Sequence, residues 1–221
     1  YSVRFAQPRS ASTALNRIHE ESDPSHILGT ITANGQIYLV NKNGFVFENG
    51  SVTNTAALVA SALNISDDTF NKGIVRVLDE AKGNVQAAAA FDGKADTTSS
   101  YKGVNSKAEI KVEAGAKINA GKSGNVILAA PNVSNAGAIS AEENGQIMLV
   151  ASKDKVYLQP SPNDTNNPFA GLLVEVETGG KVSNSVSGEI SARQGNITLA
   201  GFAVKQDGKL KATTSVNNNG S

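Results

Sequence analysis

Apolar and polar residues alternate through much of this chain, and one alternating template returns several times. Its first clear copy is ITANGQIYL at residues 31–39, where a glycine separates two alternating runs. Related copies occur at 118–128, 139–149 and 190–199, with a weaker echo at 208–212. From Ile118 to Ile139 is 21 positions. A repeat of this length indicates stacked structural units rather than one globular core.

The physics of one repeat explains the stack. Period-two alternation places Ile31, Ala33, Ile37 and Leu39 on one face of an extended chain. The small alanine and the glycine mark a bend where a bulky side chain would not fit. Strands this short need a copy above and below, about 4.7–4.9 Å away, to cover their apolar face. We therefore predict an all-β protein, a single-stranded right-handed parallel β-helix, with about ten rungs and a height of about 45–50 Å.

We expect one β-helical domain over residues 1–221. Ser66 followed by Asp67 and Asp68 is typical of a helix start, with a hydroxyl cap and acids in the first turn. Helical spacing around Ile74 to Leu78 and the alanines at 87–90 favour a short helix or an irregular segment there. The expected segments are early strands at 1–7, 14–18, 27–40, 45–47 and 57–63, an insertion at about 66–103, regular rungs at about 104–158 and 172–216, and an extruded loop at 159–171. The tail at 217–221 resembles the cut end of a longer solenoid.

Composition changes this picture little. The net charge is zero and aromatic residues make up 5%, so no basic field or stacking surface indicates a nucleic-acid partner. There is no cysteine, which excludes disulfides and thiolate chemistry. The 21 glycines and many asparagines favour tight turns between strands.

Candidate chemistry is sparse. His19 and His26 flank a proline turn without further ligands at metal-binding spacing, so we expect solvated loop histidines. The acids after Ser66 fit helix capping better than paired-carboxylate catalysis, and Glu142-Glu143 fits an exposed turn. We therefore expect no catalytic, cofactor-binding or metal-binding residues, and a protein that is not an enzyme.

Several ordered blocks near the amino terminus do carry a resemblance. They are FAQP at 5–8, ALNR at 14–17, DPSHILG at 23–29, ANGQIYLVNKNG at 33–44 and LVASALNIS at 58–66. In this order and spacing they resemble the amino-terminal two-partner secretion (TPS) domain of the filamentous haemagglutinin family of large Gram-negative exoproteins. The match is dense over residues 3–70 and looser in the later rungs.

This resemblance implies a fold and a function. The fold is a right-handed β-helix that is secreted through the periplasm to the cell surface or the medium. Its partner is an outer-membrane β-barrel transporter, whose periplasmic POTRA domains recognise it. Folding outside the cell then nucleates the rest of the solenoid. The full-length protein is expected to be an adhesin or haemagglutinin that contacts a host cell surface or a host protein.

Two departures from the family are visible. The usual Asn-Pro-Asn-Gly turn is Asn41-Lys42-Asn43-Gly44 here; lysine lacks proline's fixed φ, although Asn43-Gly44 can still adopt positive φ. The family also has some tens of residues ahead of the Phe-x-Gln-Pro block that form a cap, whereas this chain begins four residues before Phe5. A tight turn between rungs explains Asn41–Gly44 better than a recognition element does, although the two roles are compatible. The candidates for transporter recognition are Asn41, Asn43, Gly44, Asn34 and Gly35.

Two other functions stay open at this point. The first is an adhesin module that binds a host ligand in its own right. The second is a β-helix enzyme acting on polysaccharides, which would need clustered charges and groove-lining aromatics. The outward rung positions are instead small and polar: Thr32, Asn119, Ser140 and Ser191.

Overall fold

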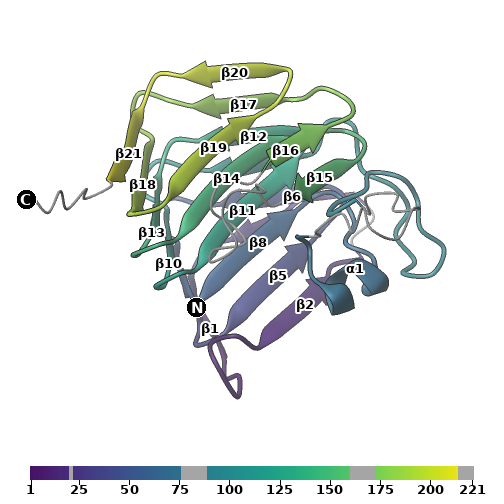
Figure 1. Cartoon of the computed structure of the whole chain (residues 1–221), viewed down its shortest axis with the longest axis horizontal. Coiled ribbons are helices and arrows are strands. Elements are labelled where there is room, and N and C mark those ends of the chain that lie inside the picture. Colours follow the sequence, from purple (N-terminus) through teal and green to yellow (C-terminus); the bar gives the residue numbers. More distant parts are fainter. Residues whose placement is uncertain (20–21, 76–88, 160–172, 214–221) are drawn as a thin grey trace, which may run out of the picture.

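The computed structural model describes residues 1–19, 22–75, 89–159 and 173–213. Over these residues the chain winds through three parallel sheets in turn (Figure 1). Sheet A contains β1 (Ser2–Phe5), β4 (Thr30–Ala33), β7 (Val52–Thr55), β10 (Lys117–Ala120), β13 (Ala138–Ala141), β18 (Glu189–Arg193) and β21 (Lys209–Thr213). Sheet B contains β2 (Thr13–Arg17), β5 (Gln36–Val40), β8 (Ala57–Ser61), β11 (Asn125–Ala130), β14 (Gln146–Ala151) and β19 (Asn196–Ala200). Sheet C contains β3 (Ser25–Ile27), β6 (Gly44–Phe47), β9 (Glu109–Val112), β12 (Asn132–Asn135), β17 (Lys181–Asn184) and β20 (Ala203–Gln206).

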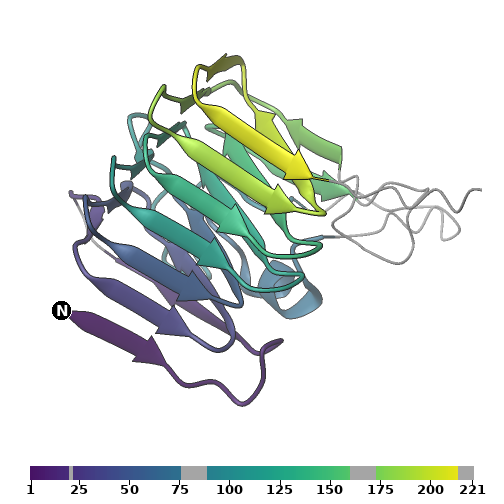
Figure 2. The same cartoon turned by 90° about the vertical axis from the view of Figure 1, so that its left-hand side faces the viewer.

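This order makes a right-handed parallel β-helix, the fold expected from the repeats. Each coil passes from sheet A to sheet B to sheet C, and every pairing within these sheets is parallel. Figure 2 shows sheet A as one ladder, rising in sequence order from the purple first strand to the yellow last strand.

The register confirms the sequence template. Ile118, Ile139, Ile190 and Leu210 stack in one column of sheet A. In sheet B, Leu58, Val126, Ile147 and Ile197 form the corresponding column. The template glycines allow the turns to stack closely, because a Cβ on Gly124 would lie 1.8 Å from the Ala56 carbonyl oxygen. The interior between the sheets is mainly apolar, as the alternation requires.

The stack is shorter than expected. The seven strands of sheet A correspond to six coils and a final strand, β21. Six coils give a stack about 29 Å high, compared with the expected height of about 45–50 Å. Two segments, described in part, lie outside the three sheets: residues 62–108 between β8 and β9, which include the expected insertion, and residues 152–180 between β14 and β17, which include strands expected as rungs.

These two segments cover the outer face of sheet B. The first contains helix α1 (Asp67–Lys72), capped by Ser66 as the sequence predicts. The second contains β15 (Val156–Gln159) and β16 (Leu173–Val176), which pair antiparallel with each other. The repeat pattern predicts both strands as parts of regular rungs; that prediction is wrong, because they pair with each other in this hairpin. The expected helical residues 76–78 and 87–88, most of the loop 159–171 and the tail 217–221 lie outside the described residues.

The cover creates a second core. Outward side chains of sheet B are apolar instead of polar, and they pack under the cover. Tyr38, Val59, Ile127 and Met148 from sheet B meet Phe91 from the cover. Sheet B is therefore buried on both faces, which is why its strands β8, β11 and β14 read as continuous apolar runs.

Candidate recognition surfaces

The Asn41–Gly44 turn is built into the solenoid. The Asn41 side chain is fully buried; its Nδ2 donates to Ser25 Oγ at 2.9 Å, and its Oδ1 accepts from the Asn43 N–H at 3.0 Å. Gly44 adopts φ +94°, and a Cβ there would lie 2.0 Å from the Glu109 carbonyl oxygen. The turn is therefore tight, and it is packed against the coils on both sides.

Asn43 joins this turn to the coil above. Its Oδ1 accepts a hydrogen bond from Asn105 Nδ2 at 3.2 Å, and the Asn105 N–H donates to the Lys42 carbonyl at 3.0 Å. Asn43 is 6% exposed. A partner could thus contact the side chain of Asn41 or Asn43 directly only if the coils separated.

The second pair of candidates fastens the first coil. Asn34 Oδ1 accepts from the Gln7 N–H at 2.7 Å, and Asn34 Nδ2 donates to the Gln7 carbonyl at 2.6 Å. Gln7 Nε2 reaches the carbonyls of Ser12 and Gln36 at 2.7 and 3.1 Å. Gly35 leaves room for that side chain, since a Cβ on it would lie 2.5 Å from Gln7 Cδ. Gln7 is thus a key structural residue that the candidate set omitted, although the FAQP block contained it.

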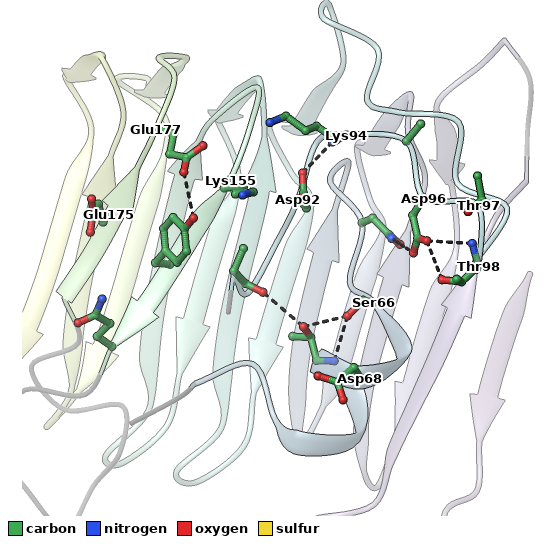
Figure 3. A pocket seen from close by; sticks show the side chains of 16 residues that line it. Ser66, Asp68, Asp92, Lys94, Asp96, Thr97, Thr98, Lys155, Glu175 and Glu177 are labelled. Atoms are coloured by element: carbon green, nitrogen blue, oxygen red, sulfur yellow. Dashed lines mark hydrogen bonds between the residues drawn. The ribbon is translucent and has the colours of Figure 1, made fainter. Parts of the chain in front are cut away.

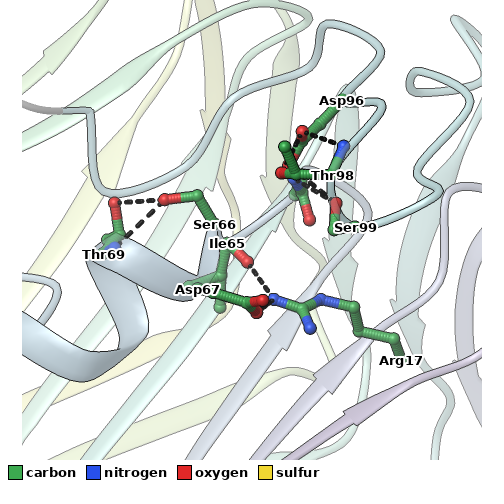
Figure 4. A network of polar contacts seen from close by, with 9 residues as sticks. Arg17, Ile65, Ser66, Asp67, Thr69, Asp96, Thr98 and Ser99 are labelled. Atoms are coloured by element: carbon green, nitrogen blue, oxygen red, sulfur yellow. Dashed lines mark hydrogen bonds and ion pairs between the residues drawn. The ribbon is translucent and has the colours of Figure 1, made fainter.

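A polar network fixes the start of the cover (Figure 4). Ser66 Oγ accepts from the Thr69 N–H at 3.0 Å and so caps α1. The Arg17 guanidinium, from β2, donates to the Ile65 carbonyl and to Asp67, each at 2.7 Å. Asp67 thus lies in the first turn of α1, as the capping interpretation predicts, and it also forms an ion pair with Arg17.

Asp96 is the centre of a neighbouring cluster. Hydrogen bonds from the Thr98 and Ser99 hydroxyls, with further donors from the Thr98 backbone and Asn64, lower the pKa of Asp96 to about 2. These hydrogen bonds tie the loop 92–101 to Asn64, just after β8 of sheet B. The carboxylate stays ionised over the whole physiological pH range.

A cleft of about 860 Å³ lies between α1, this loop and the hairpin (Figure 3). The Tyr157 hydroxyl donates to Glu177 Oε1 at 2.9 Å; desolvation and this bond raise the pKa of Tyr157 to about 12. Charged residues lining the cleft are Asp68, Asp92, Asp96, Glu175, Glu177, Lys94 and Lys155. The repeat pattern does not predict this cleft, because the cleft is formed by the irregular segments and not by the repeats.

Nothing in the described part of the chain gathers three or more metal-ligating side chains. His26 Nδ1 lies 2.6 Å from Glu48 Oε1 on the surface of sheet C, and His19 is exposed. Over the same residues, no helix has the length and apolar character of a membrane span.

Together these features define the class of protein. It is a right-handed parallel β-helix in which irregular segments cover one face and form a polar cleft. Residues 1–168 match the family model of the TPS secretion domain. The chain belongs to this family. TPS domains work with a partner transporter and are in general not enzymes, and the exoproteins that contain them are secreted by Gram-negative bacteria.

Individual relatives agree with this assignment. A heme/hemopexin-binding protein of Haemophilus influenzae (strain ATCC 51907 / DSM 11121 / KW20 / Rd) is 30% identical over 197 residues, which cover 89% of this chain and 18% of the relative. A second heme/hemopexin-binding protein of Haemophilus influenzae is 38% identical over 63 residues, covering 28% of this chain and 7% of the relative. The chain thus spans under a fifth of the length of these relatives. The crystal structure of the HMW1 secretion domain from Haemophilus influenzae has the same fold, with a TM-score of 0.53 and 20% identity over 95% of this chain and 53% of that one.

Proposed function

We propose that this chain is the N-terminal secretion domain of a two-partner exoprotein, and that POTRA domains of an outer-membrane β-barrel transporter recognise it in the periplasm. The observation that supports this most is the family match over residues 1–168. That range contains the first coils and both the helix and the first strand of the cover. Export then takes the chain through the transporter to the cell surface or the medium.

The proposal includes a role in folding after export. In the last coil, Val204 and Leu210 continue interior columns, yet they are 46% and 41% exposed. They offer apolar side chains to a further coil, beside strand edges with which no described residue pairs. The completed coils thus provide a template on which downstream repeats of an exoprotein add.

The turn candidates fit this proposal indirectly. Asn41, Asn43 and Gly44 hold adjacent coils in register, and Asn34 with Gly35 fixes the first coil to the second. We propose that they serve transporter recognition by shaping the surface that is presented, and not through direct contact.

A secretion assay tests the proposal. The chain is co-expressed, behind a periplasmic signal sequence, with a two-partner secretion transporter from the same genome, and the medium is assayed for the chain. We expect release with the intact transporter and retention in the periplasm when its POTRA domains are deleted. Equal release in both strains would contradict the proposal.

Capture of a host ligand is a second candidate, favoured by the names of the two Haemophilus relatives. We propose it for the full-length exoprotein, as an adhesin or a host-protein binder, because the chain covers so little of those relatives. Titration of the purified chain with hemopexin, with heme and with host cells tests whether the domain binds on its own. Saturable binding would assign the activity to this domain, and its absence would place it elsewhere in the exoprotein.

A further inference from the structure

The tripeptide Glu-Asn-Gly occurs at two turns of the solenoid, at residues 48–50 and at residues 143–145. In this sequence the backbone nitrogen of the glycine can attack Cγ of the asparagine side chain, because glycine has no Cβ that obstructs its approach. The reaction requires a glycine N–H without a hydrogen-bond partner and a backbone that can turn toward the side chain. The two turns share these three residues, so any difference in their reactivity comes from their surroundings.

The turn at Asn49-Gly50 meets both requirements. Both residues are exposed, and the Gly50 N–H donates to no residue that the structure describes. A Cβ on Gly50 would meet no atom within 4 Å, so the space around this peptide is open. Two hydrogen bonds hold the turn: the Ser51 N–H donates to the Glu48 carbonyl at 2.9 Å, and the Asn49 N–H donates to Glu113 Oε2 at 3.3 Å. A surface turn with so few contacts opens at low cost.

The turn at Asn144-Gly145 meets neither requirement. The Gly145 N–H donates to the Glu142 carbonyl at 2.9 Å, and the Asn144 N–H donates to the Arg193 carbonyl of the next coil at 3.0 Å. Gly145 is buried, and a Cβ on it would lie 2.5 Å from Ala141 Cβ. Attack by this nitrogen would break a hydrogen bond and displace buried backbone.

The other described Asn-Gly pairs are also held in place. Both polar atoms of the Asn34 side chain bond to the backbone of Gln7, at 2.7 and 2.6 Å. Asn43 is 6% exposed, and the Gly44 N–H donates to the Asn41 carbonyl at 2.8 Å. Of the four Asn-Gly pairs that the structure describes, the pair at 49–50 thus has the open surroundings.

We propose that Asn49 is a site of spontaneous deamidation in the folded domain. The Gly50 nitrogen bonds to Asn49 Cγ, the C–N bond of the side-chain amide breaks, and ammonia leaves with the proton that the Gly50 nitrogen gives up. Water then opens the resulting succinimide ring. Cleavage at Cγ gives aspartate, and cleavage at the α-carbonyl gives isoaspartate, in which the backbone runs through the former side chain. Water is the sole co-reactant.

The conversion changes a corner between sheets C and A. Either product adds a carboxylate near those of Glu48 and Glu113, where like charges repel. Isoaspartate also lengthens the backbone by one carbon just ahead of β7. The Ser51 carbonyl accepts from the Lys117 N–H of the next coil at 2.9 Å, so a displaced corner should weaken the contact between these coils.

Peptide mapping by mass spectrometry tests the proposal. The purified chain is incubated in mildly alkaline buffer, with and without urea, and aspartate and isoaspartate are quantified at Asn49 and at Asn144. In the folded chain we expect Asn49 to convert at least about tenfold faster than Asn144. In urea we expect similar rates, because only the shared tripeptide remains. Equal rates in the folded chain, or no conversion at Asn49, would overturn the proposal.

The variant Asn49→Gln provides a matched control for the consequence. Glutamine keeps the amide, but its additional methylene group moves the amide carbon away from the position that the Gly50 nitrogen attacks. We expect the fresh wild-type chain and the variant to unfold at similar urea concentrations, and incubation to lower the midpoint of the wild-type chain alone. An equal fall in both proteins would contradict a role of Asn49 in the loss of stability.

Discussion

The guanidinium Nη2 of Arg17 lies 2.7 Å from Asp67 Oδ1 and thereby joins the first complete coil to a helix fifty residues later. The same Nη2 donates to the Ile65 carbonyl, also at 2.7 Å. The Arg17 side chain is 19% exposed, whereas Asp67 is 67% exposed. The carbonyl contact therefore matters more to stability than the ion pair, which solvent screens.

Arg17→Ala should lower the free energy of unfolding by about 1–3 kcal/mol, because it leaves the Ile65 carbonyl without its donor and removes packing under α1. Urea unfolding of the purified chain measures this. Arg9→Ala, at an exposed position, is the control and should change stability by less than about 0.5 kcal/mol. Equal effects of the two variants would show that Arg17 does not fasten the cover.

Gly44→Ala should be strongly destabilising, by about 3 kcal/mol or more, because it combines positive-φ strain with a backbone clash. Gly50 is a matched control: it has φ +82°, but a Cβ there would meet no atom within 4 Å. Gly50→Ala should therefore cost only about 1–2 kcal/mol. Thermal or urea unfolding compares the two, and similar losses would mean that the contact with Glu109 relaxes easily.

Thr53 is buried in an interior column between Ile31 and Ile118, and its Oγ1 has no hydrogen-bond partner among the described residues. Thr53→Val should raise the free energy of unfolding by about 1 kcal/mol, because it replaces an unpaired buried hydroxyl with a methyl group. Thr32→Val, on the outer face of sheet A, should leave it nearly unchanged. A loss of stability in Thr53→Val would show that the hydroxyl is satisfied.

Asp96 should contribute to acid sensitivity. Its pKa is lowered from 3.8 to about 2 in the folded chain, so the folded state binds fewer protons than the unfolded state between these values. Its contribution to stability is complete above pH 4 and is lost as the pH falls toward 2. Asp96→Asn should therefore flatten the pH dependence of the unfolding free energy over this range, as followed by fluorescence or circular dichroism. An unchanged slope would contradict the assignment.

The repeats could be recognised from the sequence because aliphatic residues recur in them at fixed spacing, as Ile118, Ile139 and Ile190 do. Strand β7 could not be recognised in the same way. Its inward residues, Thr53 and Thr55, carry hydroxyl groups, so the alternation of apolar and polar residues is not visible there. The number of coils was overestimated for a related reason: the apolar alternation of β15 and β16 does not distinguish a rung from an antiparallel hairpin.

The recognition candidates show the same limit. The turn at Asn41–Gly44 is evident in the sequence, but its burial is not, because the covering residues 105–109 follow only after the long insertion. The cleft could not be predicted either. Its walls come from residues 64–69, 89–98, 155–159 and 175–177, which have no common period.

Both departures from the solenoid occur at the same corner, after sheet B and before sheet C. The other corners that are fully described are short connections, so those coils close without help from the excursions. Insertions at this corner can therefore differ in length and charge between relatives while the aliphatic columns stay aligned. Partner choice can thus diversify on one side of the molecule independently of its ability to fold.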